Sequence, residues 1–169
     1  QETADSNAFP AHEKNAKEFM HAAIKFWQKC FFSHEYVLSD YPTLGAVDYV
    51  RAVVDAGAIA IYLTGRDEPG MGRGTRTLLE HWGFPMGKNQ GHLILKPYFG
   101  KDDSEFKDEA LRHLRTHSDV VALFDNEPAN FHVFEKNFPD AYLVFLHSTC
   151  SQKEAKDVRR IYRIEDFLR

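Results

Sequence analysis

Three residues with useful side-chain chemistry, Thr64, Lys96 and Asp125, each stand directly after a short apolar run. Such runs predict buried strands, and open α/β sheets bind ligands beyond the carboxyl ends of their strands. If the strands are parallel, a hydroxyl, an ammonium and a carboxylate therefore share one edge of the sheet. This combination suits a phosphate group together with a divalent cation.

Each of these residue types has a defined part in such a site. Thr64, the backbone around Gly65 and the guanidinium of Arg66 can donate hydrogen bonds to phosphate oxygens, and Lys96 supplies a point charge. Asp125 and Glu127 offer the oxygen ligands that Mg²⁺ prefers. Taken singly, each has an ordinary explanation as a turn residue, a solvated lysine or an acidic helix start. Their order along the chain is what favours phosphate chemistry.

The composition limits the classes of function. The chain has 169 residues and a net charge of −4, which gives no basic surface for nucleic acid or an anionic membrane. No apolar run approaches the length of a membrane span and no secretory signal is visible, so we expect a cytoplasmic protein. The two cysteines, Cys30 and Cys150, are expected to be buried thiols rather than a disulfide.

The N-terminal part of the chain predicts a tail and a helix. Residues 1–10 are polar and without period, and we interpret them as a loose tail. Apolar residues then recur at helical spacing over residues 16–32, where Phe19, Trp27 and Phe31 share one face. We expect this face to pack into the core, with a cap over the substrate as the alternative.

The remaining pattern predicts alternating helices and strands. We expect helices over 44–55, up to Gly83, over 103–116 and over 128–137, and strands over 58–63, 93–95, 120–124 and 141–146, followed by a last element over 161–167. This alternation favours a Rossmann-like α/β fold, with a mostly parallel sheet and helices on both faces. His147 follows the fourth strand, and we interpret it as a surface or core histidine.

A glycine-rich stretch, Gly70-Met71-Gly72-Arg73-Gly74, invites comparison with nucleotide-binding loops. The spacing differs from the dinucleotide fingerprint, and the predicted strand stops several residues earlier. We interpret the stretch as a mobile loop and rank nucleotide binding last among the hypotheses.

Three segments, in this order, make the chain resemble the haloacid dehalogenase (HAD) superfamily of phosphohydrolases. The segments are Pro42–Val47 with Ile61-Tyr62-Leu63-Thr64-Gly65-Arg66, then Lys96-Pro97 with Phe106-Lys107, and then Val121–Asn130 with Asp125-Asn126-Glu127. They are similar to the second, third and fourth motifs of that family, and the resemblance covers about residues 40–150. It implies a cap-like helical segment at 11–40 and an α/β core at 41–169.

The resemblance also implies a reaction and its site. It implies Mg²⁺-dependent hydrolysis of a small phosphorylated substrate through an aspartyl-phosphate, with Thr64 and Lys96 as catalytic residues, phosphate bound by Thr64, Gly65, Arg66 and Lys96, and metal bound by Asp125 and Glu127. The family's nucleophile is the first Asp of an Asp-x-Asp signature that ends the first, central strand of its sheet. No Asp-x-Asp occurs in these 169 residues. The chain as written is therefore expected to be inactive.

Two explanations of this absence compete. The chain is a fragment of a longer phosphohydrolase, which we favour because Thr64, Lys96 and Asp125 are all present, or a natural protein that lost the activity. A non-catalytic module that binds a phosphorylated ligand or a protein is the alternative function. A sheet without its central strand exposes unpaired backbone groups. We therefore expect the structure to close the gap, to fill it from another segment, or to swap a strand within a homo-oligomer.

Overall fold

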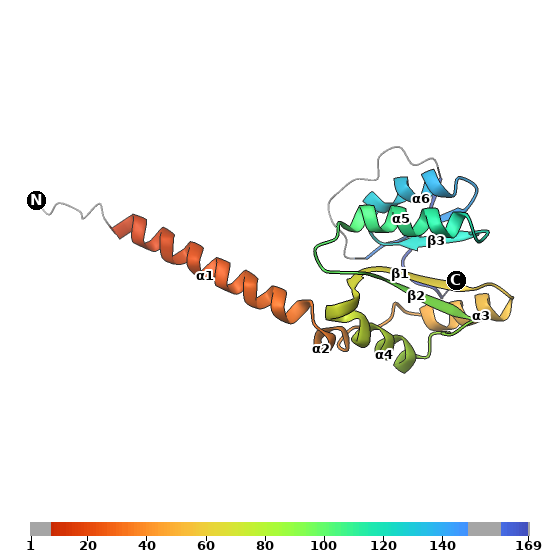
Figure 1. Cartoon of the computed structure of the whole chain (residues 1–169), viewed down its shortest axis with the longest axis horizontal. Helices are drawn as coiled ribbons and strands as arrows, with labels where there is room; N and C mark the ends of the chain where they lie inside the picture. Colours follow the sequence, from red (N-terminus) through yellow and green to blue (C-terminus); the bar gives the residue numbers. More distant parts are fainter. Residues whose placement is uncertain (1–7, 149–159, 169) are drawn as a thin grey trace, which may run out of the picture.

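The computed structural model describes the backbone of residues 8–148 and 160–168, and the side chains from residue 15 onward within these ranges. Helix α1 (Ala8–Phe31) extends away from the rest of the chain, as Figure 1 shows. A short helix, α2 (His34–Val37), follows it, and the Ser33 hydroxyl caps this helix by accepting a hydrogen bond from the Tyr36 amide. Residues Ala8–Pro10, expected in a loose tail, already belong to α1.

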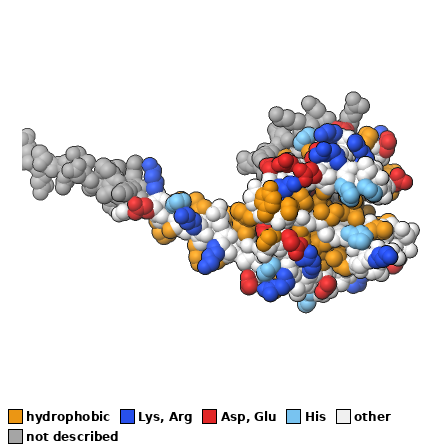
Figure 2. All heavy atoms as spheres, viewed as in Figure 1, with side chains coloured by type: hydrophobic (Ala, Val, Ile, Leu, Met, Phe, Trp, Pro, Cys, Tyr) orange, Lys and Arg blue, Asp and Glu red, His pale blue; other side chains and the backbone are white. Residues whose placement is uncertain are grey.

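The predicted packing of α1 into the core is wrong. Phe19 is 75% exposed and Trp27 is 51% exposed, and Figure 2 shows hydrophobic side chains along the projecting helix. Cys30 is also exposed, which corrects the expectation of a buried thiol, whereas Cys150 lies outside the described residues. Among the α1 side chains that the structure describes, those at its C-terminal end contact other elements, through ring contacts among Trp27, Phe31, Phe32, Tyr36 and Phe99.

The first half of the folded body contains two parallel strands. Helix α3 (Ala46–Asp55) precedes β1 (Ala60–Asp67), which runs directly into a π-helical turn, η1 (Glu68–Gly72), and helix α4 (Arg73–Trp82). Strand β2 (Gly91–Lys96) pairs with β1, with Thr64 opposite Leu95 and a register shift before Asp67 pairs with Lys96. Thr64, Gly65 and Arg66 therefore lie inside β1, not after its end at residue 63 as expected.

The second half contains three parallel strands. Helix α5 (Asp103–Arg115) begins at the capping carboxylate of Asp102 and leads to β3 (Ala122–Asp125), a 3₁₀ turn η2 (Pro128–Asn130) and helix α6 (Phe131–Asn137). Strands β4 (Tyr142–Leu146) and β5 (Ile161–Ile164) complete it. The last element, expected over 161–167, is thus a strand that pairs with β4. Phe167, after the end of this strand, contacts the ring of Phe124 in β3.

The strands form two sheets rather than the single sheet that the sequence predicted. One sheet has the order β1-β2 and the other the order β3-β4-β5. All pairs within them are parallel, which confirms the α/β class with parallel pairing. Within the described residues, no strand pairs with members of both sheets.

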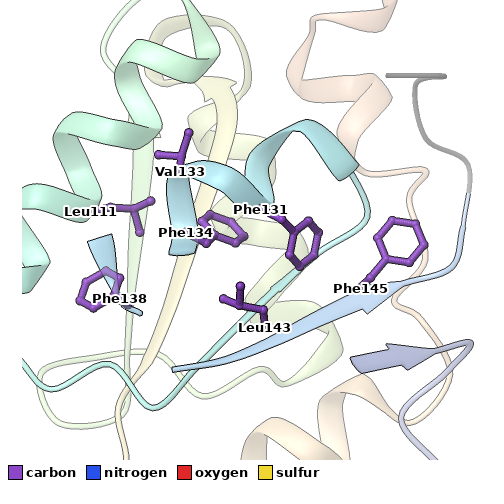
Figure 3. Close-up of a cluster of buried hydrophobic side chains, with 7 residues drawn as sticks. All are labelled: Leu111, Phe131, Val133, Phe134, Phe138, Leu143 and Phe145. Atoms are coloured by element: carbon purple, nitrogen blue, oxygen red, sulfur yellow. The ribbon is translucent and has the colours of Figure 1, made fainter. Parts of the chain in front are cut away.

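Helices cover the strands on two sides, as Figure 1 shows, with α5 and α6 on one side and α3 and α4 on the other. The main core lies between α5, α6 and β4. Figure 3 shows Phe131 and Phe134 of α6 above Leu143 of β4, with Phe145 of β4 beside Phe131, which is fully buried. Leu63 of β1 packs against the same cluster, so the core joins the two sheets. No helix within the described residues is long and apolar enough to span a membrane.

Candidate functional site

The buried ammonium of Lys96 lies at the end of β2 beside the first turn of α5. Its side chain is 9% exposed, and its Nζ lies 2.6 Å from Oδ1 of Asp103. Gly65 of β1 is close to the same carboxylate, since a Cβ added at Gly65 would lie 3.1 Å from Oδ2 of Asp103. The structure therefore brings Gly65, Lys96 and Asp103 together. Gly65 and Lys96 were both expected to contact phosphate, so their closeness is what that expectation requires.

A second charged cluster lies at the end of β3. The Nζ of Lys107 lies 2.8 Å from Oδ2 of Asp125, and the two side chains are 14% and 12% exposed. The side-chain amide of Asn130 donates to the same oxygen at 2.8 Å, and the backbone N–H of Glu127 donates to Oδ1 at 2.8 Å. Asp125 is thus held in one orientation, because both of its oxygens accept hydrogen bonds.

Helix α5 connects the two clusters. Asp103 and Lys107 are four residues apart, so they lie on one face of the helix, about one 5.4 Å turn from each other. Asp103 contacts the end of β2, and Lys107 contacts the end of β3. The carboxyl ends of β2 and β3 therefore lie along the first two turns of α5, although the described parts of their two sheets are not paired with each other.

Asp103 and Lys107 are the two residues of this site that the analysis of the sequence did not assign. In the sequence Asp103 only begins the helix expected over 103–116, and Lys107 belongs only to the Phe106-Lys107 segment of the resemblance. Opposite charges four residues apart on a helix usually indicate an exposed pair with each other. Here each charge instead contacts a residue from a different strand, which spacing along the sequence does not reveal.

Thr64 and Arg66 interact with groups other than Lys96 and Asp103. The hydroxyl oxygen of Thr64 accepts a hydrogen bond from the backbone N–H of Arg66 at 3.3 Å. The guanidinium of Arg66 forms an ion pair with Asp40 in the segment before α3. Arg66 and Asp40 line a hollow of about 310 Å³, whose other lining residues are Tyr41, Pro42, Leu78, Leu79, Trp82 and Phe84. Arg66 is thus engaged away from the Lys96–Asp103 pair.

The carboxylates at the end of β3 do not by themselves fit a complete metal site. Within the described ranges, no group of three or more His, Cys, Asp or Glu residues is placed to hold a metal ion. Asp125 already accepts hydrogen bonds on both oxygens, one of them from the ammonium of Lys107. Mg²⁺ prefers six oxygen ligands, so Asp125 and Glu127 would need further oxygen donors from a phosphate, water or another segment.

The glycine-rich stretch forms η1 and the start of α4 and is not an open loop. The backbone N–H of Gly70 donates to Oδ2 of the buried Asp67 at 2.8 Å, and that of Gly74 donates to Nδ1 of His34 at 3.2 Å. A doubly hydrogen-bonded ion pair with Arg76 holds Glu68, and it lowers the pKa of that carboxyl. Two of the backbone donors that a nucleotide phosphate would need are therefore already used.

The described structure thus brings Gly65 and Lys96 together at Asp103. Asp125 lies at Lys107, which is one turn further along α5 than Asp103. Glu127 follows two residues after Asp125. The exposed His147 lies beyond β4, and its backbone N–H donates to the carbonyl oxygen of Ile164.

No protein-family model, no curated protein and no solved structure matches this chain.

Proposed function

We propose that this chain is the phosphate-binding part of a HAD-type phosphohydrolase, in a form that lacks the nucleophile. The observation that carries the proposal is the arrangement along α5, where Gly65 and Lys96 meet at Asp103 and Lys107 contacts Asp125 one turn later. A buried lysine beside a glycine of the neighbouring strand favours an anion, because the ammonium and a nearby backbone N–H can both donate to it.

In this proposal the chain's own residues bind and orient a phosphate. Thr64 and the backbone at Gly65 donate hydrogen bonds, and Lys96 balances the negative charge once Asp103 moves aside. Lys107 and Asn130 keep the Asp125 carboxylate in place. A bound Mg²⁺ would supply charge stabilisation of the phosphate, with Asp125 and Glu127 among its oxygen ligands. Without an Asp-x-Asp segment, these residues position the phosphate but form no aspartyl-phosphate.

A non-catalytic binding module is the second candidate. The observation that favours it is that Lys96 and Asp125 are each already paired with an oppositely charged residue, Asp103 and Lys107. Ion pairs of this kind also occur as structural links between elements. A module of this class would bind a phosphorylated ligand or a protein at the same edge without turnover.

The proposal is tested by titrating the 169-residue protein with inorganic phosphate while following backbone amide shifts. We expect saturable changes at Gly65 and Lys96, and we expect Lys96→Met and Thr64→Val to weaken binding at least fivefold. Thr116→Val is the matched control, since this hydroxyl caps the far end of α5. Phosphate shifts spread evenly over exposed lysines, or unchanged by Lys96→Met, would contradict the proposal.

An activity assay tests whether this chain itself contains a nucleophile, and the reading frame separates the enzyme from the binding module. With Mg²⁺ and para-nitrophenyl phosphate, we expect no turnover by the 169-residue protein. Turnover that Thr64→Val abolishes would show that a nucleophile is present and contradict this expectation. An Asp-x-Asp segment encoded in the same reading frame would favour the enzyme, and a reading frame without it would favour the module.

A further inference from the structure

Helix α1 has a broad apolar side along the part whose side chains the structure describes. At about 100° per residue, the apolar residues of 15–31 fill a continuous arc of about 160° around the helix axis. The arc runs from Phe26 at one margin, through Phe19, Ala23 and Trp27, to Ile24 at the other margin. No polar residue of this part interrupts the arc, so α1 is divided lengthwise into an apolar and a polar side.

This apolar side is exposed. All residues from 15 to 30 are exposed, and the side chains of Phe26 and Met20 are 70% and 60% exposed. Figure 1 shows α1 extending away from the body of the protein, and its described contacts lie at its C-terminal end, where Phe31 meets Tyr36. An exposed apolar patch of this size indicates a binding surface.

The opposite side of α1 is basic. Lys17, Lys25 and Lys29 lie there, and Glu18 is the one acidic residue among residues 15–31. Figure 2 shows blue basic and orange hydrophobic side chains along this helix. The net charge of −4, which predicts no affinity of the whole chain for an anionic membrane, therefore does not describe α1. A helix with lysines on one side and exposed Phe and Trp on the other is typical of peptides that lie on a lipid surface.

The width and the charge of α1 favour a lipid surface over a second copy of the chain. Pairing of two helices needs a stripe of two apolar positions in seven, whereas the apolar arc of α1 covers almost half of the circumference. A paired helix would therefore leave one margin of the arc in water, at Phe26 or at Ile24. Pairing would also double the excess of lysine over glutamate, whereas anionic headgroups would neutralise it.

We propose that α1 binds the surface of membranes that contain anionic lipids. The helix lies along the surface, with its apolar side among the upper parts of the acyl chains and its three lysines at the headgroups. It does not cross the bilayer, because no helix within the described ranges is long and apolar enough to do so. This proposal depends on α1 alone and not on phosphate chemistry.

Vesicle co-sedimentation of the 169-residue protein tests the proposal. One set of vesicles contains equal amounts of phosphatidylglycerol and phosphatidylcholine, and the other contains phosphatidylcholine alone. We expect at least tenfold tighter binding to the anionic vesicles, and about 0.5 M NaCl should remove most of this preference. Equal binding to both sets, or no binding to either, would overturn the proposal.

Substitutions on the apolar side show whether α1 is the part that binds. Phe19→Ser/Phe26→Ser should weaken binding to the anionic vesicles at least tenfold, and it should leave the body folded because both side chains are at least 70% exposed. Val121→Ser is the matched control, since this apolar residue is 67% exposed outside α1. Binding that the double variant leaves unchanged would assign the contact to another surface and contradict the proposal.

Substitutions on the basic side test the electrostatic part. Lys25→Gln/Lys29→Gln should weaken binding to anionic vesicles at least fivefold and leave binding to phosphatidylcholine unchanged. Lys88→Gln/Arg115→Gln is the control, because it removes the same charge from exposed positions of the body. Equal losses in the two double variants would make the net charge, and not α1, responsible for binding, and would overturn the proposal.

Tryptophan fluorescence shows the orientation of the helix and identifies a competing partner. Lipids brominated on their acyl chains should quench the wild-type protein, and Trp27→Phe, which retains Trp82, should lose this quenching but still bind. Absence of quenching during binding would contradict insertion of the apolar side. A dimer in sedimentation that Phe19→Ser/Phe26→Ser abolishes and anionic vesicles do not dissociate would assign this side to a second copy and overturn the proposal.

Discussion

Lys107 on α5 and Asp125 at the end of β3 form a mostly buried ion pair, with Nζ 2.8 Å from Oδ2. Lys107→Met should lower the free energy of unfolding by about 3 kcal/mol, because a buried carboxylate then loses its opposite charge. Urea denaturation measures the loss. Lys136→Met is the control, since that exposed lysine should contribute less than about 1 kcal/mol through its 3.4 Å pair with Asp108. The double variant Lys107→Met/Asp125→Asn also removes the unpaired charge and should regain part of the stability. If it is no more stable than Lys107→Met, the unpaired Asp125 charge is not the cause of the loss.

Asp103 competes with a bound anion for Lys96. Asp103→Asn should therefore strengthen binding of inorganic phosphate by about threefold to fivefold, the change expected for removing one partly exposed charge partner. Isothermal titration at low salt measures the affinity. Glu109→Gln is the control, because Glu109 lies on the same helix as Asp103 but pairs with Lys101 instead of Lys96. Weaker binding by Asp103→Asn would instead make Asp103 a residue that positions Lys96 for the phosphate.

Tyr62 of β1 makes the free energy of unfolding depend on pH above pH 10. Its hydroxyl donates to the Pro85 carbonyl at 2.8 Å, and burial raises its pKa from 10.0 to about 12. Between these values the unfolded chain releases a proton that the folded protein keeps. The contribution of Tyr62 to the free energy of unfolding is therefore constant below pH 10 and declines as the pH rises to about 12.

Denaturation of wild type and Tyr62→Phe across this pH range tests the decline. Below pH 10 the variant should be less stable by about 1 kcal/mol through the lost hydrogen bond, and the difference should shrink above pH 10 and change sign as the pH approaches 12. Tyr142→Phe removes an exposed tyrosine and should keep the wild-type decline. A difference between wild type and Tyr62→Phe that stays constant over the whole range would contradict the assignment.

Gly74 allows α4 to lie against the backbone of α2. A Cβ added there would come within 2.6 Å of the His34 carbonyl oxygen, and backbone cannot move aside as a flexible side chain can. Gly74→Ala should lower the melting temperature and cost about 1–3 kcal/mol. Gly100→Ala meets no atom within 4 Å and should be close to neutral. Equal effects of the two substitutions would show that α2 is not held closely by α4.

Strand positions were largely predictable, and strand lengths were not. The apolar runs at 93–95 and 141–146 became β2 and β4 because short apolar runs can satisfy their backbone groups only by pairing. Strand β1 continues through Thr64, Gly65 and Arg66 because β2 remains alongside, with a shift in register before Asp67. Such pairing between distant segments is not visible in the local pattern of polar and apolar residues.

The sequence indicated that α1 has an apolar face but not what covers that face. Phe19 and Trp27 lie on the predicted side of a helix, yet no described part of the chain reaches them beyond the last turn. For the site, Lys96 and Asp125 could be named because each follows a predicted strand. Lys107 could not be assigned, since its contact with Asp125 depends on how α5 packs across both sheets.

The division of the strands into two sheets also bears on how the protein unfolds. Each sheet is built from neighbouring parts of the chain, β1-β2 before Pro97 and β3-β4-β5 after Lys101, and mainly side chains connect them. The two halves are therefore expected to behave as separate cooperative units, and the half with the buried Phe131 cluster should open last. Native-state hydrogen exchange in rising urea would show two groups of amides with different opening energies. We therefore expect the β1-β2 half to unfold at lower urea concentrations than the half that contains the Phe131 cluster.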